Sequence, residues 1–376
     1  MAKYRFDQIA INSTEKKKPV EEDRFTYLGL EHLDSGSLKV SRYGSDVAPI
    51  GEKLVMHKGD VLFGKRRAYQ KKVAIAPFDG IFSAHGMVLR PKEDVIDKGF
   101  FPLFISSDYF LDAAIKISVG SLSPTINWRD LKELEFELPD MDTQRKLAEV
   151  LWSINDTMEA YKKLISATDE LVKSQFMEQF GDPDNNTHGF PVVTLKEVAS
   201  GPLSYGSVSS AVAYDGATRY VRITDITDDG RLGNDIKSAA QTDNKYLLHE
   251  GDILFARTGA TVGKTCRYRE NYGRAIYAGF LIRLIPKTDV VLPDYLYQFT
   301  KSDYYWNFVR SAQRVVAQPN INAQEYGDLQ MLLPSIHDQE KFAAFVQQSD
   351  KSKFELEQAL SELTATYKRI IAENLG

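Results

Sequence analysis

The sequence has few of the residues that build metal sites and disulfides. Its single cysteine, Cys266, excludes an internal disulfide and any zinc site made of several cysteines. The six histidines are scattered, without the close spacing that puts two ligands on one face of a helix. We therefore expect no metal site, no other cofactor and a reducing compartment.

Long apolar runs are missing as well. No run approaches the roughly 18 residues that cross a bilayer, and the start of the chain lacks the apolar segment of a signal peptide. Hydrophobic residues make up 43% and charged residues 26% of the 376 residues, which is ordinary for a soluble protein of two or three domains. We expect a cytoplasmic protein that makes no contact with a membrane.

Positive charge is scarce overall but concentrated in two places. The net charge is −5. Residues 53–92 nevertheless carry nine Lys and Arg against two Asp, and residues 254–287 carry seven against one Glu. Such basic islands on an acidic body favour binding to phosphates, because local charge matters more for that than the total charge.

The two islands lie in two copies of one sequence plan, residues 1–180 and 181–376. Short signposts recur in the same order about 190 residues apart, while most of the sequence between them does not match. The period is far longer than the roughly 20–50 residues of a solenoid repeat, so the duplication predicts two whole domains. The matched pairs are Tyr27–Leu33 with Tyr220–Ile226, Lys58–Phe63 with Glu250–Phe255, Pro91-Lys92 with Pro286-Lys287, Ser123–Asn127 with Gln318–Asn322, and Leu138-Pro139 with Leu333-Pro334.

Each copy is predicted to contain a mixed α/β (α+β) globule. Short β-branched or aromatic runs bounded by Gly, Asp and Pro indicate strands. Aromatic residues at spacings of three and four predict a helix near residues 100–117 and another near 293–310. The expected strands include 4–6, 61–63, 73–75 and 87–89 in the first copy, and 192–195, 253–255 and 280–282 in the second.

Each globule is followed by a heptad pattern that predicts a long helix. The apolar positions alternate steps of four and three, as in a coiled coil. Asp142 and Asp338 are the expected N-caps, and Gly181 is the expected end of the first helix. The residues expected to pack the helices on each other or on a partner are Leu147, Leu151, Ile154 and Met158 in the first helix and Leu356, Leu360, Leu363 and Tyr367 in the second.

The two helices are expected to run antiparallel, because the first leads away from one globule and the second returns from the other. This organisation predicts two tandem-repeat globules joined by two long antiparallel coiled-coil helices with pseudo-twofold symmetry, the helices being about 55 Å long. The predicted segments are a globule at 1–142, a helix at 143–180, a globule at 181–335 and a helix at 336–376.

This pattern resembles that of the specificity subunits (HsdS) of type I restriction-modification systems. The resemblance covers essentially the whole chain and rests on Tyr27–Glu31, Lys58–Phe63, Gly251–Gly259, and a Leu-Pro pair followed by Gln144 in one copy and Gln339 in the other. It implies two target-recognition domains, each of which reads one half of a bipartite, asymmetric site on double-stranded DNA. It also implies helices that space the domains and bind two methyltransferase (modification, HsdM) subunits, with restriction (HsdR) subunits in the full complex.

The segments between the signposts diverge so freely in this family that the resemblance assigns no base-reading residue. The two basic loops are the better guide, because they mix Arg and Lys with Tyr, Gln and Thr, which can reach base edges as well as phosphates. A solvated run of charges is the alternative interpretation. The expected DNA-binding residues are Lys65, Arg66, Arg67, Tyr69, Gln70, Lys71, Lys72 and Ser121 in the first copy and Arg257, Thr258, Thr261, Lys264, Arg267, Gln313 and Arg314 in the second.

No catalytic constellation is evident in the sequence. Gly259–Thr265 resembles a phosphate-binding P-loop, but Thr258 stands where that motif has its first Gly, and strand and turn residues follow instead of a helix. We expect no catalytic residue and a non-catalytic component whose enzyme activity resides in partner subunits. The alternative is a two-domain coiled-coil scaffold for protein partners without DNA recognition; duplex binding with a steep salt dependence would distinguish the two.

Overall fold

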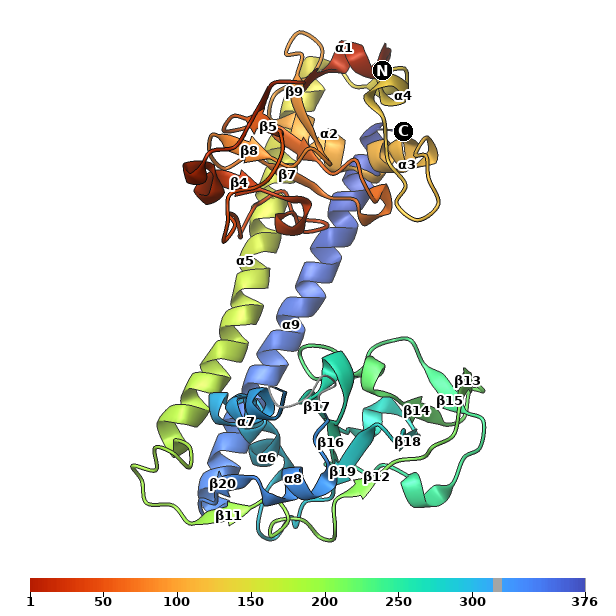
Figure 1. Cartoon of the computed structure of the whole chain (residues 1–376). Coiled ribbons are helices and arrows are strands. Elements are labelled where there is room, and N and C mark those ends of the chain that lie inside the picture. The colour runs from red at the N-terminus through yellow and green to blue at the C-terminus, as the bar shows by residue number, and fades with distance from the viewer. Residues whose placement is uncertain (314–319, 376) are drawn as a thin grey trace. The chain divides into compact units, whose positions relative to one another are not determined.

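The structure is a computed structural model that describes residues 1–313 and 320–375, and the chain divides into two compact units. Unit 1 comprises residues 1–162 and 358–376, and unit 2 comprises residues 163–357. Helix α5 (Met141–Phe180) and helix α9 (Ile336–Leu375) each contribute one end to each unit. Every unit therefore consists of one globule and two helix ends (Figure 1).

The first globule contains two four-stranded sheets and one strand pair. The strand orders are β2-β9-β6-β7, β3-β5-β8-β4 and β1-β10. Its strands are β1 (Ala2–Arg5), β2 (Ala10–Ser13), β3 (Lys16–Lys17), β4 (Tyr27–Leu28), β5 (Lys53–Met56), β6 (Val61–Phe63), β7 (Val73–Ile75), β8 (Gly80–Phe82), β9 (Met87–Pro91) and β10 (Glu135–Leu138). Its helices are α1 (Phe6–Ile9), α2 (Phe100–Ser106), α3 (Asp108–Lys116) and α4 (Trp128–Leu131), with short 3-10 turns η1 (Glu21–Thr26), η2 (Leu30–His32) and η3 (Ala68–Gln70).

The second globule contains one four-stranded sheet, β12-β19-β16-β17, and the strand pairs β11-β20, β13-β15 and β14-β18. Its strands are β11 (Val192–Thr194), β12 (Ser204–Tyr205), β13 (Ala211–Ala213), β14 (Arg219–Val221), β15 (Lys237–Ala239), β16 (Ile253–Ala256), β17 (Thr265–Arg267), β18 (Ala275–Tyr277), β19 (Leu281–Leu284) and β20 (Gln330–Leu332). Its helices are α6 (Pro293–Phe299), α7 (Asp303–Gln313) and α8 (Ala323–Asp328), with 3-10 turns η4 (Ile223–Asp225), η5 (Asn244–Tyr246), η6 (Gly259–Thr261) and η7 (Glu270–Tyr272).

One four-stranded sheet has the same strand order in both globules, β2-β9-β6-β7 in the first and β12-β19-β16-β17 in the second, and the predicted mixed fold class is confirmed. In the first, Phe63 of β6 is paired with Val73 on one side and Met87 on the other. In the second, Phe255 of β16 is paired with Thr265 and Ile282 in the same way. Positions that correspond in this manner are called equivalent below; their numbers differ by 192 around β6–β7 and by 195 from β9 onward.

Each globule buries aromatic residues against both helix ends. In unit 1, Leu151 of α5 and Ile371 of α9 belong to the core that also contains Phe104. In unit 2, Phe176 of α5 lies 5.5 Å from Phe342 of α9, measured between ring centroids. The early part of one helix thus meets the late part of the other within each unit, so the helices run antiparallel, as predicted (Figure 1).

A buried glutamine joins each globule to the start of the helix that follows it. The side-chain amide of Gln144 accepts a hydrogen bond from the N–H of Asp97 and donates to the carbonyls of Val95 and Pro139, at 2.8, 3.2 and 2.9 Å. The equivalent Gln339 makes the same three contacts to Leu292, Val290 and Pro334, at 2.8, 3.1 and 3.0 Å. Both glutamines are at most 1% exposed, so the Leu-Pro and Gln signpost is a structural joint.

The predicted helix contacts differ in how far they are buried. Leu151 and Met158 are buried, and the other six predicted residues are partly exposed. Leu147 and Tyr367 pack against the core of unit 1. The apolar pattern weakens at Lys353, and this lysine is itself only 7% exposed.

Several predicted boundaries were wrong. The helix expected near 100–117 is two helices, because Ser107 is extended and its hydroxyl accepts the N–H of Phe110 at 3.2 Å; α6 and α7 likewise replace the helix expected near 293–310. The N-caps are Asp140 and Ser335 rather than Asp142 and Asp338, since their side chains accept the third N–H that follows. The predicted strands 61–63, 73–75, 87–89 and 253–255 are confirmed, whereas residue 6 begins α1 and residue 280 precedes β19.

Within residues 1–313 and 320–375, no helix combines the length and the apolar character that a membrane crossing requires.

Candidate nucleic-acid interface

The two basic loops lie at equivalent places and have the same length. Loop 1 (residues 64–72) joins β6 to β7, and loop 2 (residues 256–264) joins β16 to β17. The first residue of each loop donates its N–H to the carbonyl of the last, at 2.9 Å in loop 1 and 2.8 Å in loop 2. Further along, Lys65 and Arg257 each accept the N–H of an isoleucine from the Pro-x-Ile-Asn signpost, both at 2.9 Å. The backbone thus presents both loops in one way.

The tip of loop 1 is exposed and carries two arginines. Arg66 and Arg67 are both exposed, and Tyr69 is 57% exposed. Arg67 and Lys71 adopt left-handed backbone angles, with φ of 55° and 48°, which are unfavourable for non-glycine residues. Gln70 is partly exposed at the end of η3. This tight turn directs the arginines into solvent, where a phosphate or a base edge could reach them.

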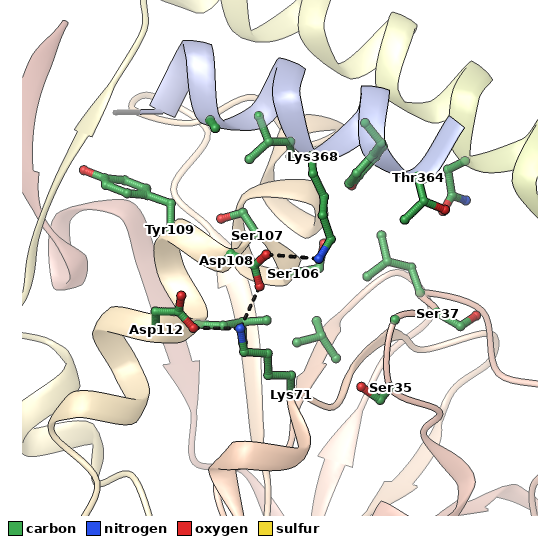
Figure 2. A pocket seen from close by; sticks show the side chains of 18 of the residues that line it. Ser35, Ser37, Lys71, Ser106, Ser107, Asp108, Tyr109, Asp112, Thr364 and Lys368 are labelled. Atoms are coloured by element: carbon green, nitrogen blue, oxygen red, sulfur yellow. Dashed lines mark hydrogen bonds and ion pairs between the residues drawn. The ribbon is translucent and has the colours of Figure 1, made fainter. Parts of the chain in front are cut away.

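The two lysines that end loop 1 point back into the protein. Lys71 contacts the carboxylates of Asp108 and Asp112 at 2.6 and 2.7 Å, and Lys368 of α9 contacts Asp108 from another side at 3.4 Å (Figure 2). Burial lowers the pKa of Lys71, but the hydrogen bonds to Asp108 and Asp112 outweigh it, so the net shift is upward. Lys72 donates to the carbonyl of Leu30 at 2.6 Å. Both lysines therefore have partners within the globule.

Positive charges gather around the base of loop 1. Burial and the nearby Lys16 lower the pKa of Lys65. Burial, Arg66, Lys65 and Lys53 lower the pKa of His85, whose Nε2 lies 3.3 Å from Arg66 Nη1. Cations that disfavour one another's charged forms make a site that an anion would stabilise. Sequence analysis missed Lys16, Lys53 and His85, because only the fold brings them to loop 1.

Loop 2 presents one arginine held in a defined orientation. Arg257 Nε donates to Asn320 Oδ1 at 3.1 Å, and its guanidinium carbon lies 4.8 Å from the centre of the Tyr205 ring. Thr258 and Thr261 are partly exposed, and Thr261 Oγ1 donates to the Thr258 carbonyl at 3.2 Å. Strand β17 follows this loop, so the glycine-rich segment does not enter a helix as a P-loop does.

The other two cations predicted around loop 2 have carboxylate partners. Lys264 pairs with Asp228 at 2.6 Å. Arg267 lies in β17, its side chain is 12% exposed, and it pairs with Asp294 and with Glu250, the latter at 3.3 Å. The guanidinium of Arg267 is thus engaged inside the globule, away from the exposed part of the loop.

The remaining predicted residues lie in the connectors before the Pro-x-Ile-Asn signposts. Ser121 is exposed in a small turn closed by hydrogen bonds between Val119 and Thr125, at 2.9 and 3.0 Å. Gln313 is partly exposed at the end of α7. Arg314 lies outside the described residues.

One exposed position beside the loops differs in chemistry between the globules. His85 accepts the N–H of Arg66 at its backbone carbonyl, at 3.3 Å. The equivalent Phe280 accepts the N–H of Arg257, at 3.1 Å, and its ring is 60% exposed. An imidazole can form hydrogen bonds, whereas a phenyl ring offers stacking or contact with a methyl group. Neither residue was predicted from the sequence, where nothing marks them.

Among the residues that the structure describes, no group of three or more His, Cys, Asp or Glu could hold a metal ion.

Comparisons with known proteins agree on one family. The family described as "Type I restriction modification DNA specificity domain" matches residues 14–167 and again 188–364. A type I restriction enzyme EcoDI specificity subunit from Escherichia coli is 29% identical over 160 residues, which are 41% of this chain and 35% of that subunit's length. The StySPI specificity subunit from Salmonella potsdam is 21% identical over 353 residues, which are 87% of this chain and 74% of that subunit.

A solved structure supports the fold over the whole chain. The crystal structure of a type I restriction-modification system S subunit from M. genitalium superposes with a TM-score of 0.57 at 16% identity, covering 100% of this chain and 96% of that one. At this identity the likeness concerns the fold.

Proposed function

The chain belongs to the family of type I restriction-modification DNA specificity domains and is a DNA-recognition subunit, and we propose that each globule reads one half of a bipartite, asymmetric site through its basic loop. The two matched regions of the family correspond to the two copies of the plan. Different side chains on equivalent loops would read different sequences. The scaffold alternative, without DNA recognition, is not favoured.

The observation that carries the proposal is the pair of arginines at the tip of loop 1. Arg66 and Arg67 are exposed, and within the described residues neither forms an ion pair with a carboxylate. Lys71 and Lys72 of the same loop have internal partners, and Lys65 is partly exposed at its base. The tip thus places positive charge where an external anion can approach, and DNA phosphates are such anions.

In this proposal the other residues of the two loops have matching roles. Lys65, Tyr69, Gln70 and Ser121 accompany the arginines in the first globule. In the second globule, Arg257 and its neighbours Thr258, Thr261 and Gln313 would make the contacts. The tethered cations would hold the loops in place.

The partners and the chemistry follow from the family. We propose that the helices space the two globules and dock two methyltransferase (HsdM) subunits, and that restriction (HsdR) subunits join the full complex. Methylation and cleavage would then belong to those partners, with this chain as the non-catalytic component. The cytoplasmic location stays a prediction from the sequence.

The test is a double substitution at the loop 1 tip, Arg66→Ala with Arg67→Ala. We expect weaker binding of the full chain to a DNA duplex and a salt dependence whose slope falls by about one unit per lost phosphate contact. The matched control is Arg129→Ala with Arg145→Ala, which removes two exposed arginines of the same unit that pair with Asp130 and Asp142. Fluorescence anisotropy at several salt concentrations measures both. If both doubles bind like the parent chain, loop 1 does not meet DNA.

A further inference from the structure

Equivalent places on the two helices carry different chemistry. Gln144 and Gln339, 195 residues apart, make the same contacts. By the same spacing, Met158 is equivalent to Lys353, and Thr364 is equivalent to Asp169. In unit 1, Thr364 Oγ1 lies 3.9 Å from Met158 Sδ, which is a weak contact. In unit 2, the same two places hold a lysine and an aspartate.

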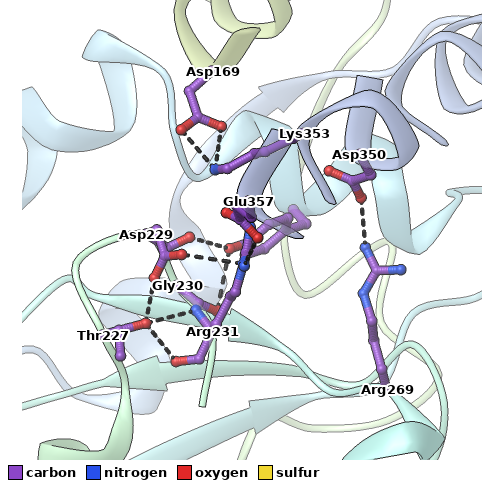
Figure 3. A network of polar contacts seen from close by, with 10 residues as sticks. Asp169, Thr227, Asp229, Gly230, Arg231, Arg269, Asp350, Lys353 and Glu357 are labelled. Carbon is purple, nitrogen blue, oxygen red and sulfur yellow. Dashed lines mark hydrogen bonds and ion pairs between the residues drawn. The ribbon is translucent and has the colours of Figure 1, made fainter. Parts of the chain in front are cut away.

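The pair in unit 2 is a close ion pair across the helices. Lys353 Nζ lies 2.7 Å from each carboxylate oxygen of Asp169 (Figure 3). Lys353 is 7% exposed, so its charge needs a partner to remain stable there. Asp169 keeps about half of its side chain in solvent, at 56% exposed. The buried member of the pair is therefore the lysine.

A turn of the second globule, residues 227–231, lines the same cavity as Lys353. The pKa of the Asp229 carboxyl is lowered: burial opposes this, and the Thr227 hydroxyl, Arg231 and Lys353 outweigh it. Arg231 also binds Glu357 of α9 through two parallel hydrogen bonds, both 2.8 Å, one helical turn beyond Lys353 (Figure 3). Through Lys353 and Glu357, helix α9 thus contacts both α5 and the turn.

The same turn also contacts loop 2. Asp228, whose side chain is 96% exposed, forms the 2.6 Å ion pair with Lys264, the last residue of that loop. The Tyr297 hydroxyl lies 3.3 Å from the carbonyls of Asp229 and Gly230 and supports the turn from α6. Contacts therefore run without a break from α5, through α9 and the turn, to loop 2.

Unit 1 uses another route. There, Lys71 of loop 1 reaches α9 through Asp108 and Lys368. The residue equivalent to Glu357 is Lys162, which pairs with Glu159 on its own helix at 2.8 Å. The side chains of this route are partly or largely exposed: Lys71 is 32%, Asp108 50% and Lys368 66% exposed. No buried charge anchors this route in the part of unit 1 that the structure describes.

We propose that Asp169, Lys353, Asp229, Arg231 and Glu357 form a polar lock whose members are positioning residues for loop 2. The lock fixes how loop 2 is held on the helix ends, and so it sets recognition of the half-site that the second globule reads. This role rests on the proposed function of the globules. A lysine is costly to bury, and an uncharged pair fits the equivalent place in unit 1, so the lock serves orientation more than stability.

The experiment replaces the lock pair by the pair that unit 1 has. The variant Asp169→Thr with Lys353→Met should keep the melting temperature within a few degrees of the parent. Arg231→Met, a second variant, removes the other end of the lock without touching the helices. The control Lys245→Met removes an exposed ion pair of the same globule, Lys245 with Asp243 at 3.0 Å.

Two measurements decide the proposal. Hydrogen exchange in the free chain should speed up about tenfold at the amides of residues 227–231 and 257–264 in both lock variants and remain unchanged in the control. DNA binding by the full chain to a library randomised at both half-sites should lose about tenfold in discrimination at the second half-site and none at the first.

Each outcome has one meaning. Unchanged exchange and unchanged discrimination in folded variants would overturn the lock. Faster exchange with equal loss at both half-sites would also overturn it, because the effect would not be confined to the second globule. If the parent chain itself shows no half-site preference, the proposed function fails, and the exchange data alone still judge the lock.

Discussion

Where the helix ends pack against the globule, unit 1 has a cavity of about 710 Å³ and unit 2 one of about 520 Å³, and equivalent residues of the helices line both. In unit 1 these residues are largely uncharged, and the buried Asn155 has a side-chain N–H₂ group without a partner among the described residues. In unit 2 they carry charge and join in ion pairs. The equivalent pairs are Asn155 with Asp350, Met158 with Lys353, Thr364 with Asp169, Tyr367 with Val172, and Lys368 with Lys173.

Units 1 and 2 share the contacts that hold the fold together and differ in other side chains. Strand register, the glutamine joints and the Gly-Asp turns are the same in both globules. In the cavities, the contacting pair Met158 and Thr364 of unit 1 is replaced in unit 2 by the ion pair Lys353 and Asp169. Two contacting side chains can be replaced together, because each is the other's interaction partner. The glutamine of a joint cannot be replaced in this way, because it forms hydrogen bonds to three backbone groups.

The largest expected effect tests whether the glutamine joints of the two units contribute equally to the free energy of unfolding. Gln144→Ala and Gln339→Ala each leave one buried N–H and two carbonyls without their side-chain partner, so each should lower the free energy of unfolding by about 2–4 kcal/mol. Denaturant unfolding measures this, with Gln348→Ala, an exposed glutamine of α9, as the control. A loss below about 1 kcal/mol at either site would mean that this joint does not hold its globule.

A second prediction concerns a partly buried lysine that only the second globule has. Burial lowers the pKa of Lys301 to about 8, whereas the equivalent residue of the first globule is Ser106. The folded pKa is below the unfolded value of about 10.4, so the charged lysine destabilises the fold below pH 8, and the penalty fades as pH rises from 8 to 10.4.

Lys301→Met should therefore stabilise the protein by about 2–3 kcal/mol at pH 7 and by little near pH 10. Unfolding curves at both pH values measure the difference between variant and parent. The control Lys351→Met removes an exposed lysine of α9 and should show no such trend. A stabilisation that is independent of pH would contradict the assigned pKa shift.

A third prediction exchanges the side chains beside the loops. His85→Phe should change base preference only in the half-site of the first globule, and Phe280→His only in that of the second, each by about 1 kcal/mol. The pKa of His85 is lowered from 6.5, so its ring is neutral at pH 7 and above, and the effect should be constant from pH 7 to 8. Binding to a library randomised at both half-sites measures it; a change in the opposite half-site would break the one-globule, one-half-site assignment.

The smallest effect distinguishes exposed cations from tethered ones within loop 1. Arg67→Met should reduce the salt slope of DNA binding by about one unit, while Lys71→Met should leave the slope unchanged, because Lys71 already has two carboxylate partners. Titrations at several salt concentrations compare the two. Equal slopes for both variants would show that tethering does not decide which cations meet phosphates.

The sequence predicted well what depends on neighbouring residues. Short β-branched runs after Gly-Asp formed strands β6 and β16, since such runs bury both faces and the glycine permits the turn before them. The heptad patterns formed α5 and α9 because their period is that of a helix with one apolar face. Local caps were less certain: Asp140 and Asp142 are both acceptable acceptors, and the chain path selects the first.

By itself, then, the sequence determined the duplication, the two α/β globules, the two long helices and the presence of two basic loops, since all of these follow from periodicity and composition. Only the tertiary structure decided which of these cations have a carboxylate partner. Lys71, Lys264 and Arg267 look like Arg66 and Arg257 in the sequence, but Asp108, Asp228 and Asp294 approach them from segments about 30 to 40 residues away. Lys353 looked like an interruption of the helix pattern, and its partner Asp169 lies on the other helix. The charge of a side chain follows from the sequence, but its partner depends on which distant segments the fold brings next to it.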